Sequence, residues 1–157
     1  MWHAHSGIQR QDGAFGAFIV RENSQDDIHA KKYDFDQSEH IIIINDWLNI
    51  TGIEKFVQHY HNDGNIRADA ILINGKGVYY EYQTSLKGII ETPRAVFTVK
   101  KGFRYRFRLI DAGVLLCPMQ ISIDNHNITV IATDGNDVEA IELESLTIYA
   151  GKVKDSF

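Results

Sequence analysis

Short apolar segments separated by turn residues are the feature that most limits the folds open to this chain. The segments are rich in Ile, Val, Phe and Tyr, and several alternate polar with apolar side chains, as β-strands do. We predict strands at Phe15–Arg21, Glu39–Leu48, Ala70–Asn74, Ala95–Lys100, Phe103–Asp111, Met119–Asp124, Ile128–Thr133 and Ser145–Tyr149. About eight short strands at this spacing predict an all-β Greek-key sandwich or barrel.

Two other segments complete the predicted layout. A short helix is expected around Thr51–His59, although its apolar face is poor. The polar, irregular segment Glu22–Gln37 is expected to be a linker between the first strand and the main body, with solvated carboxylates. These carboxylates are Asp26, Asp27, Asp34 and Asp36. The residues before the linker therefore look like the tail of a preceding domain.

Composition excludes several classes of function. The 157 residues carry a net charge of −5, which argues against a nucleic-acid partner. The one basic run, Lys100–Arg108, alternates charge with aromatic side chains, so a solvated strand face is favoured over a nucleic-acid patch. No apolar stretch approaches the roughly 18 residues of a membrane span, and no secretory signal is visible at residues 1–20. The single cysteine, Cys117, leaves a buried thiol or half of a disulfide as alternatives.

Two His-x-His pairs raise the question of a metal site. On a strand, His3 and His5 would project from one face about 6–7 Å apart, and imidazole suits Cu, Zn, Fe or Ni. The spacing alone leaves metal ligands and exposed strand histidines both open. His59 and His61 lie in a polar stretch, which predicts a solvated loop, and His126 is expected to be a turn residue with a hydrogen-bonded ring.

Several stretches, in order along the chain, resemble one family. The opening WHAHSGIQRQDGAFGAFIV is similar to the second copper-ligand motif of multicopper oxidases, particularly the laccases, with His-x-His-x-Gly before Gln-x-x-Asp-Gly. Its Trp-His-Ala-His is most similar to insect-type laccases. Successive pieces of the middle cupredoxin domain resemble the stretches YDFDQSEHIIIINDWL, ADAILINGKG, ETPRAVFTVKKGFRYRFRLI and MQISIDNHNITVIATDGNDVEAIELESLTIYAG.

The resemblance implies a cupredoxin-like fold and a copper site. Residues 1–22 would be the C-terminal end of a first cupredoxin domain, and residues 23–157 the second domain. In this family a mononuclear copper takes electrons from substrate, and a trinuclear cluster reduces dioxygen to water. By their place in the motif, His3 and His5 are implied to be ligands of the type-3 copper pair in that cluster.

Two carboxylates acquire candidate roles from the same resemblance. Asp12 matches an acidic residue near the cluster, where it would relay protons, and its alternative role is to cap a turn before Gly13. Asp69 falls where many fungal laccases carry a carboxylate that lines the phenol pocket, and its alternative role is a strand-entry residue without chemistry.

The other three copper motifs of the family are absent from this sequence. We therefore expect a fragment whose parent oxidises phenol or diphenol substrates by one-electron steps, while the isolated chain is inactive. Two alternatives remain: a non-catalytic β-sandwich interaction module, and a fragment of an oxidase that acts on metal ions such as ferrous iron.

The resemblance also implies partners and a compartment. The parent would bind a phenolic substrate and dioxygen, with its remaining cupredoxin domains around this one, and would be secreted. The sequons at Asn49 and Asn127 are glycosylation sites only in that compartment.

Overall fold

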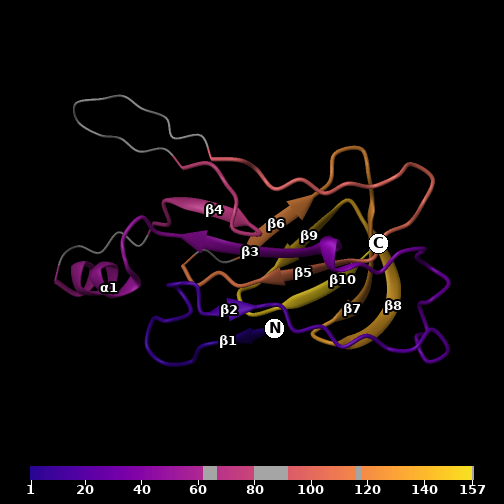
Figure 1. Ribbon diagram of the computed structural model, residues 1–157, viewed down its shortest axis with the longest axis horizontal. Helices are drawn as coiled ribbons and strands as arrows, with labels where there is room; N and C mark the ends of the chain where they lie inside the picture. Colours follow the sequence, from indigo (N-terminus) through magenta and orange to yellow (C-terminus); the bar gives the residue numbers. More distant parts are fainter. Residues whose placement is uncertain (62–66, 80–91, 116–117, 157) are drawn as a thin grey trace.

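The computed structural model describes residues 1–61, 67–79, 92–115 and 118–156 (Figure 1). Its regular elements are strands apart from one α-helix and one short 3-10 helix at Ser38–His40. The strands are β1 (Trp2–His3), β2 (Phe15–Gly16), β3 (Ile41–Trp47), β4 (Ala70–Ile73), β5 (Phe107–Asp111), β6 (Met119–Ser122), β7 (Ile128–Thr133), β8 (Asn136–Leu143), β9 (Ser145–Ile148) and β10 (Val153–Ser156), and the helix is α1 (Gly52–His61).

Six of the strands form one sheet in the order β4-β3-β5-β10-β7-β8, and β6 pairs with β9 in a second, two-stranded sheet. Within the six-stranded sheet, β3 and β5 are parallel and the other neighbours are antiparallel. Strands β1 and β2 form a separate antiparallel ribbon beside it (Figure 1). The predicted all-β fold is confirmed.

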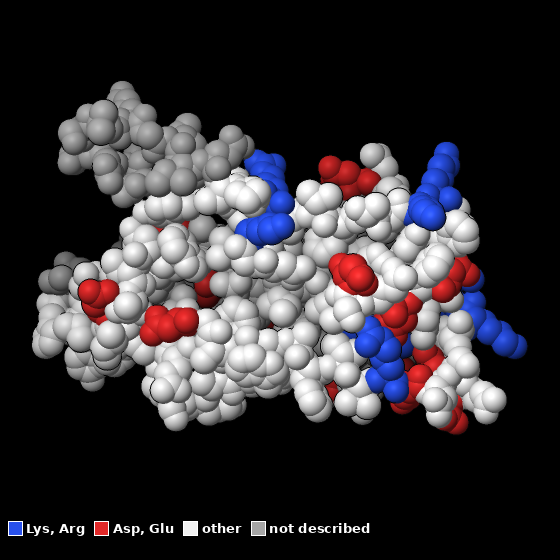
Figure 2. All heavy atoms as spheres, in the orientation of Figure 1, with Lys and Arg blue, Asp and Glu red and all other residues white. Residues whose placement is uncertain are grey.

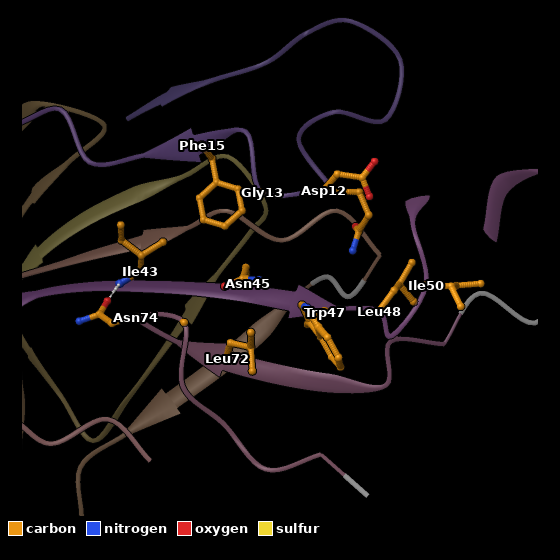
Figure 3. Close-up of a pocket in the computed structure, with 12 residues that line it drawn as sticks. Asp12, Gly13, Phe15, Ile43, Asn45, Trp47, Leu48, Ile50, Leu72 and Asn74 are labelled. Carbon is orange, nitrogen blue, oxygen red and sulfur yellow. Dashed lines mark hydrogen bonds between the residues drawn. The ribbon is translucent and has the colours of Figure 1, made fainter. Parts of the chain in front are cut away.

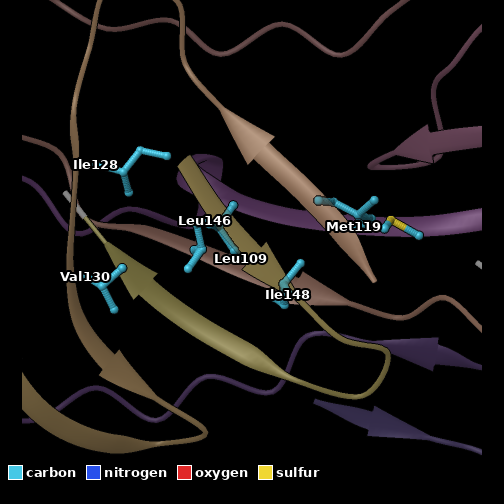
Figure 4. Close-up of a cluster of buried hydrophobic side chains, with 7 residues drawn as sticks. Leu109, Met119, Ile128, Val130, Leu146 and Ile148 are labelled. Carbon is cyan, nitrogen blue, oxygen red and sulfur yellow. The ribbon is translucent and has the colours of Figure 1, made fainter. Parts of the chain in front are cut away.

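The hydrophobic core lies between the six-stranded sheet and the β6–β9 sheet. Side chains from β3, β5, β6, β7 and β9 meet there, and most of them appear in Figure 4. The cluster consists of Ile44, Leu109, Met119, Ile128, Val130, Leu146 and Ile148. Each residue lies on a predicted strand, so the apolar pattern identified the core-facing segments correctly.

Some predicted strands are wrong in extent or existence. Residues 95–100 form no regular strand, and Val96 is 83% exposed, so an alternating sequence alone does not provide a neighbouring strand. The strand predicted at Phe15–Arg21 shortens to β2. Three strands, β1, β8 and β10, were not predicted. β1 is only two residues long, β8 is acidic and largely exposed, and β10 is the polar sequence VKDS.

The helix was predicted, and its first turn shows why it forms. Thr51 N donates to Glu54 Oε2 at 3.0 Å while Glu54 N donates to Thr51 Oγ1 at 3.4 Å, which is the reciprocal capping box. His59 and His61 lie in the last turn of α1, so the loop predicted for them is wrong, although both are exposed. An apolar stripe on α1 is also about half exposed or more: Ile53, Phe56, Val57 and Tyr60.

Ion pairs with little exposure anchor the polar segment 22–37 to the sheet, so the prediction of solvated carboxylates is wrong for Asp27 and Asp36, whereas Asp26 and Asp34 are exposed as predicted. Arg106 Nη1 lies 3.0 Å from Asp27 Oδ2, and Arg106 Nη2 lies 2.6 Å from Asp155 Oδ2. Arg108 binds both oxygens of Asp36, with Nη2 to Oδ2 at 2.7 Å. We call these five residues the arginine-paired cluster.

The cluster also corrects the prediction for the basic run. The side chains of Arg106 and Arg108 are only 12% and 5% exposed, so they do not form a solvated strand face. On the face in Figure 2, basic side chains lie among acidic ones. The alternation of charged and aromatic residues was correctly identified as a strand signal only from Phe107 onward.

Candidate functional site

The β1–β2 ribbon positions the N-terminal histidines. His3 pairs with Phe15 and Trp2 with Gly16, and Ala4 N donates to Ala14 O at 2.8 Å. The Trp2 indole lies directly over Gly16, where an added Cβ would stand 2.5 Å from Trp2 Nε1. Any larger residue at this position would have to displace the Trp2 ring.

The two imidazoles lie next to each other. The ring centroids of His3 and His5 are 4.5 Å apart, with an angle of 41° between the ring planes. His5 is exposed, whereas His3 is partly buried and its Nδ1 is buried without a hydrogen-bond partner. Burial lowers the pKa of His3, and the nearby charges of Arg10, His5 and the N-terminal amine lower it further. A neutral ring with an unpartnered nitrogen suits metal coordination.

Two histidines alone do not complete a metal site. In the described part of the chain, no group of three or more His, Cys, Asp or Glu side chains is placed to hold a metal ion. Imidazoles at one ribbon end fit copper as part of a ligand set that other residues would complete.

Asp12 contacts the helix. Its Oδ1 accepts a 2.6 Å hydrogen bond from the backbone N–H of Gly52, the first residue of α1. The positive end of the helix dipole lies there and stabilises a carboxylate. Asp12 lies in a series of turns, and the next residue, Gly13, has a φ of +98°. The structure thus gives Asp12 a structural partner outside its own turn.

Asp12 also lines a cavity of about 310 Å³ between the residue 11–15 loop and strands β3 and β4 (Figure 3). The lining is mostly apolar and aromatic, with a few polar groups from Gln11, Asp12 and Asn45. The apolar side chains are Phe15, Ile43, Trp47, Leu48, Ile50 and Leu72.

Asp69 lies at the entry to β4 and is exposed. Its Oδ2 accepts a hydrogen bond from Asn49 N at 2.8 Å, and its own N–H donates to Trp47 O at 2.8 Å. It therefore fastens the chain after β3 to the start of β4. It is not among the residues lining the cavity that contains Asp12, so the structure does not bring the two candidate carboxylates together there.

Other predicted residues have varied outcomes. His126 is a turn residue whose Nδ1 lies 2.9 Å from Asp124 O, as predicted. Asn127 Nδ2 donates to Glu142 Oε1 at 2.6 Å. The prediction for Cys117 falls outside the described residues. No helix in the described ranges is long and apolar enough to span a membrane.

Sequence reasoning missed a second group of carboxylates. Asp46 and Asp111 lie on neighbouring strands β3 and β5 and are buried, at 2% and 0% exposure. The available signal was an Asp at the end of each of two apolar runs, IIIIND and RLID. That signal does not show that the two aspartates lie close together until the parallel pairing of β3 and β5 is known.

Comparison with known proteins places the chain within one family. The family model for multicopper oxidases matches residues 38–155. Laccase-4 of Thanatephorus cucumeris is 34% identical over 157 residues, which cover 97% of this chain and 28% of that protein. The chain thus spans about a quarter of the length of such curated relatives.

Solved structures agree on the fold. The laccase from Botrytis aclada superposes with a TM-score of 0.78 at 26% identity, covering 98% of this chain and 27% of that one. Fet3p, described as a multicopper oxidase that functions in iron import, superposes with a TM-score of 0.67 over 98% of this chain and 25% of that one, but its 17% identity supports the fold alone. The narrower likeness to insect-type laccases stays a prediction. With a family model that covers most of its length and laccases among its relatives, the chain belongs to the multicopper oxidase family.

Proposed function

We propose that this chain is the part of a laccase-like multicopper oxidase that supplies two copper ligands and a middle cupredoxin domain. Residues 1–22 would end the first cupredoxin domain, and residues 23–157 would form the second. The parent would oxidise phenol or diphenol substrates by one-electron steps and reduce dioxygen to water. The relatives named laccase support this assignment.

The histidine pair is the observation that carries the proposal. His3 and His5 are adjacent, and His3 has a lowered pKa and a buried, unpartnered ring nitrogen. Copper, the metal that the family implies, would be held by these imidazoles as part of the type-3 pair and would supply one-electron redox chemistry when bound. The two residues would orient their rings from a rigid ribbon end, which the Trp2–Gly16 contact stabilises.

Two carboxylates, Asp12 and Asp69, would handle protons in the parent. Asp12 would hold a proton for oxygen reduction, in addition to the hydrogen bond that it accepts from Gly52. Asp69 would accept the phenolic proton in the parent's substrate pocket, and its exposure is compatible with that role. Its bond to Asn49 equally supports the structural alternative.

A copper titration of the chain tests the ligand assignment. We expect weak binding of added copper, because the chain presents two imidazoles without a third ligand beside them among the described residues. His3→Ala and His5→Ala should each abolish that binding. The matched control is His59→Ala with His61→Ala, because this pair has the same spacing but lies on an exposed helix. Equal binding by all variants would refute the assignment.

Activity tests the second part of the proposal. The copper-loaded chain should show no oxygen-coupled phenol oxidation and no strong blue thiolate–copper absorption. In the full-length parent, His3→Ala should abolish oxidation of phenols. A fragment that oxidises phenols by itself would contradict the expected inactivity.

Two alternatives make different predictions. A non-catalytic interaction module predicts that His3→Ala and His5→Ala change neither partner binding nor stability. A ferrous-iron oxidase finds a structural neighbour in Fet3p, but that likeness extends only to the fold, so the laccase assignment is better supported. Laccase relatives also favour a secreted parent.

A further inference from the structure

Two buried carboxyl groups, of Asp46 and Asp111, lie next to Gly113 just after the end of β5. Asp46 in β3 is 2% exposed and Asp111 in β5 is 0% exposed. A Cβ added to Gly113 would stand 2.9 Å from Asp111 Oδ1 and 3.4 Å from Asp46 Oδ2. Only glycine leaves room for the backbone to pass between them. We call Asp46 and Asp111 the acid pair.

The acid pair holds three consecutive backbone amides. Gly113 N donates to Asp111 Oδ1 at 2.8 Å. Val114 N donates to Asp46 at 3.1 Å, and Leu115 N donates to Asp46 Oδ2. Ala112 N still donates to Ile44 O of β3 at 2.8 Å, but the amides of residues 113–115 bind carboxyl oxygens instead of a neighbouring strand.

Among the described residues, no side chain forms a hydrogen bond or ion pair with Asp111 Oδ2. This oxygen is buried without a hydrogen-bond partner. Arg10 approaches from the N-terminal loop, but its Nη2 donates to the carbonyl of residue 113 at 2.6 Å and its Nε to that of residue 112 at 3.3 Å. Lys152 gives Asp111 only a backbone contact, because its Nζ binds Asp134 Oδ2 at 2.9 Å.

A buried carboxylate with an unpartnered oxygen beside a second carboxyl group is a poor place for two negative charges. Burial raises the pKa of Asp111; the Gly113 N–H lowers it, the charge of Asp46 raises it and that of Arg10 lowers it, and the net direction is upward. Asp46 accepts hydrogen bonds from the backbone N–H groups of Val114 and Leu115. The proton therefore belongs on Asp111.

We propose that Asp111, buried beside Asp46, holds a proton and acts as a pH-sensitive latch on residues 113–115. With the proton on Asp111, one negative charge is present and the three amides stay bound. When the proton leaves, two buried charges repel each other across Gly113, and the backbone of residues 113–115 opens to water. This device is independent of copper and of the proposed function.

Nuclear magnetic resonance of the 157-residue chain tests the latch. The carboxyl carbon of Asp111 should titrate at a pH above that of an ordinary aspartate. Hydrogen-exchange protection of the amides of Gly113, Val114 and Leu115 should fall about tenfold for each pH unit across that titration, after correction for intrinsic exchange. Core amides of β7 should keep their protection.

Asp111→Asn separates this proposal from a merely structural role. Asparagine keeps the shape and an acceptor oxygen but carries no proton to lose, so protection of residues 113–115 should become independent of pH. Asp124→Asn, at an exposed turn, is the control and should behave like the wild-type chain. An ordinary titration of Asp111, or protection that does not change with pH in the wild-type chain, would overturn the proposal. The titration needs no variant, so it decides the question even if Asp111→Asn fails to fold.

Discussion

In the described part of the chain, aspartates with little exposed surface lie in two places, and their surroundings differ. In the arginine-paired cluster, Asp27, Asp36 and Asp155 face guanidinium groups. In the acid pair, Asp46 and Asp111 border each other and bind backbone amides. Both groups flank β5, so arginines neutralise the carboxylates near the start of this strand, whereas the proposed proton on Asp111 lies at its end.

As the pH changes, the arginine-paired cluster and the acid pair change the free energy of unfolding in opposite directions. Burial alone would raise the pKa of Asp36, but Arg108 and more distant arginines lower it below the ordinary 3.8, and Asp27 behaves likewise through Tyr33, the His29 N–H and Arg106. Their contribution is present above that ordinary value and is lost as the pH falls through the folded pKa. Asp111 has a raised pKa, so its contribution is full below 3.8 and is lost as the pH rises through its folded pKa.

Removal of Arg106 should have the largest effect on this comparison. Arg106→Met leaves Asp27 and Asp155 buried without their shared cation, which should lower the free energy of unfolding by about 3 kcal/mol. Urea denaturation at neutral pH measures the loss. A change below about 1 kcal/mol would mean that the buried ion pairs do not anchor segment 22–37.

Asp36→Asn should have a smaller effect with a defined pH dependence. The substitution keeps the shape but removes the charge that Arg108 binds through both nitrogens, at a cost of about 2 kcal/mol near neutral pH. Because the variant has no carboxylate to protonate, it should lose less stability than the wild-type chain between pH 7 and pH 3. Parallel loss in both proteins would contradict the assigned cause.

Asp12 lies in a third kind of environment, because its carboxylate accepts a hydrogen bond from the first N–H of α1. Asp12→Ala should destabilise α1 by about 1 kcal/mol, and Asp12→Asn by less, because asparagine also accepts the Gly52 hydrogen bond. Circular dichroism with thermal unfolding measures the order of the two variants. Equal effects would show that charge rather than the hydrogen bond matters here.

The smallest effect is expected at an exposed pair. Arg104 Nη2 lies 3.2 Å from Asp34 Oδ1, with side chains 52% and 36% exposed. Arg104→Ala should change the free energy of unfolding by no more than about 0.5 kcal/mol, and added salt should reduce that difference. A larger loss of stability would contradict the expectation that buried arginine–aspartate pairs stabilise the fold more than exposed ones.

The sequence predicted those parts of the fold whose apolar pattern is sufficient by itself. Strands β3, β5 and β7 contain core residues at strand spacing and were found. Strand β10 was missed because Asp155 and Ser156 are buried polar residues. Asp155 is stabilised there by Arg106, just before β5, and Arg108, in β5, both about 50 residues away.

The candidate site shows the same limit. His3–His5 and His59–His61 have identical spacing, but the first pair lies at a ribbon end with adjacent rings, whereas the second lies on a helix, where positions i and i+2 diverge. Backbone conformation decided the outcome, and spacing could not. The acid pair was equally hidden, because it depends on the parallel alignment of Ile44 with Asp111.

The place of β10 has a consequence for the order in which the chain folds. Residues 153–156 lie between β5 and β7, which pair with β10 and not with each other. Until those residues leave the ribosome, the large sheet exists as two halves with unpaired edges next to the core. Such edges attract other chains, so we expect the pairing of β10 to remove two of the unpaired edges through which a nascent chain can aggregate.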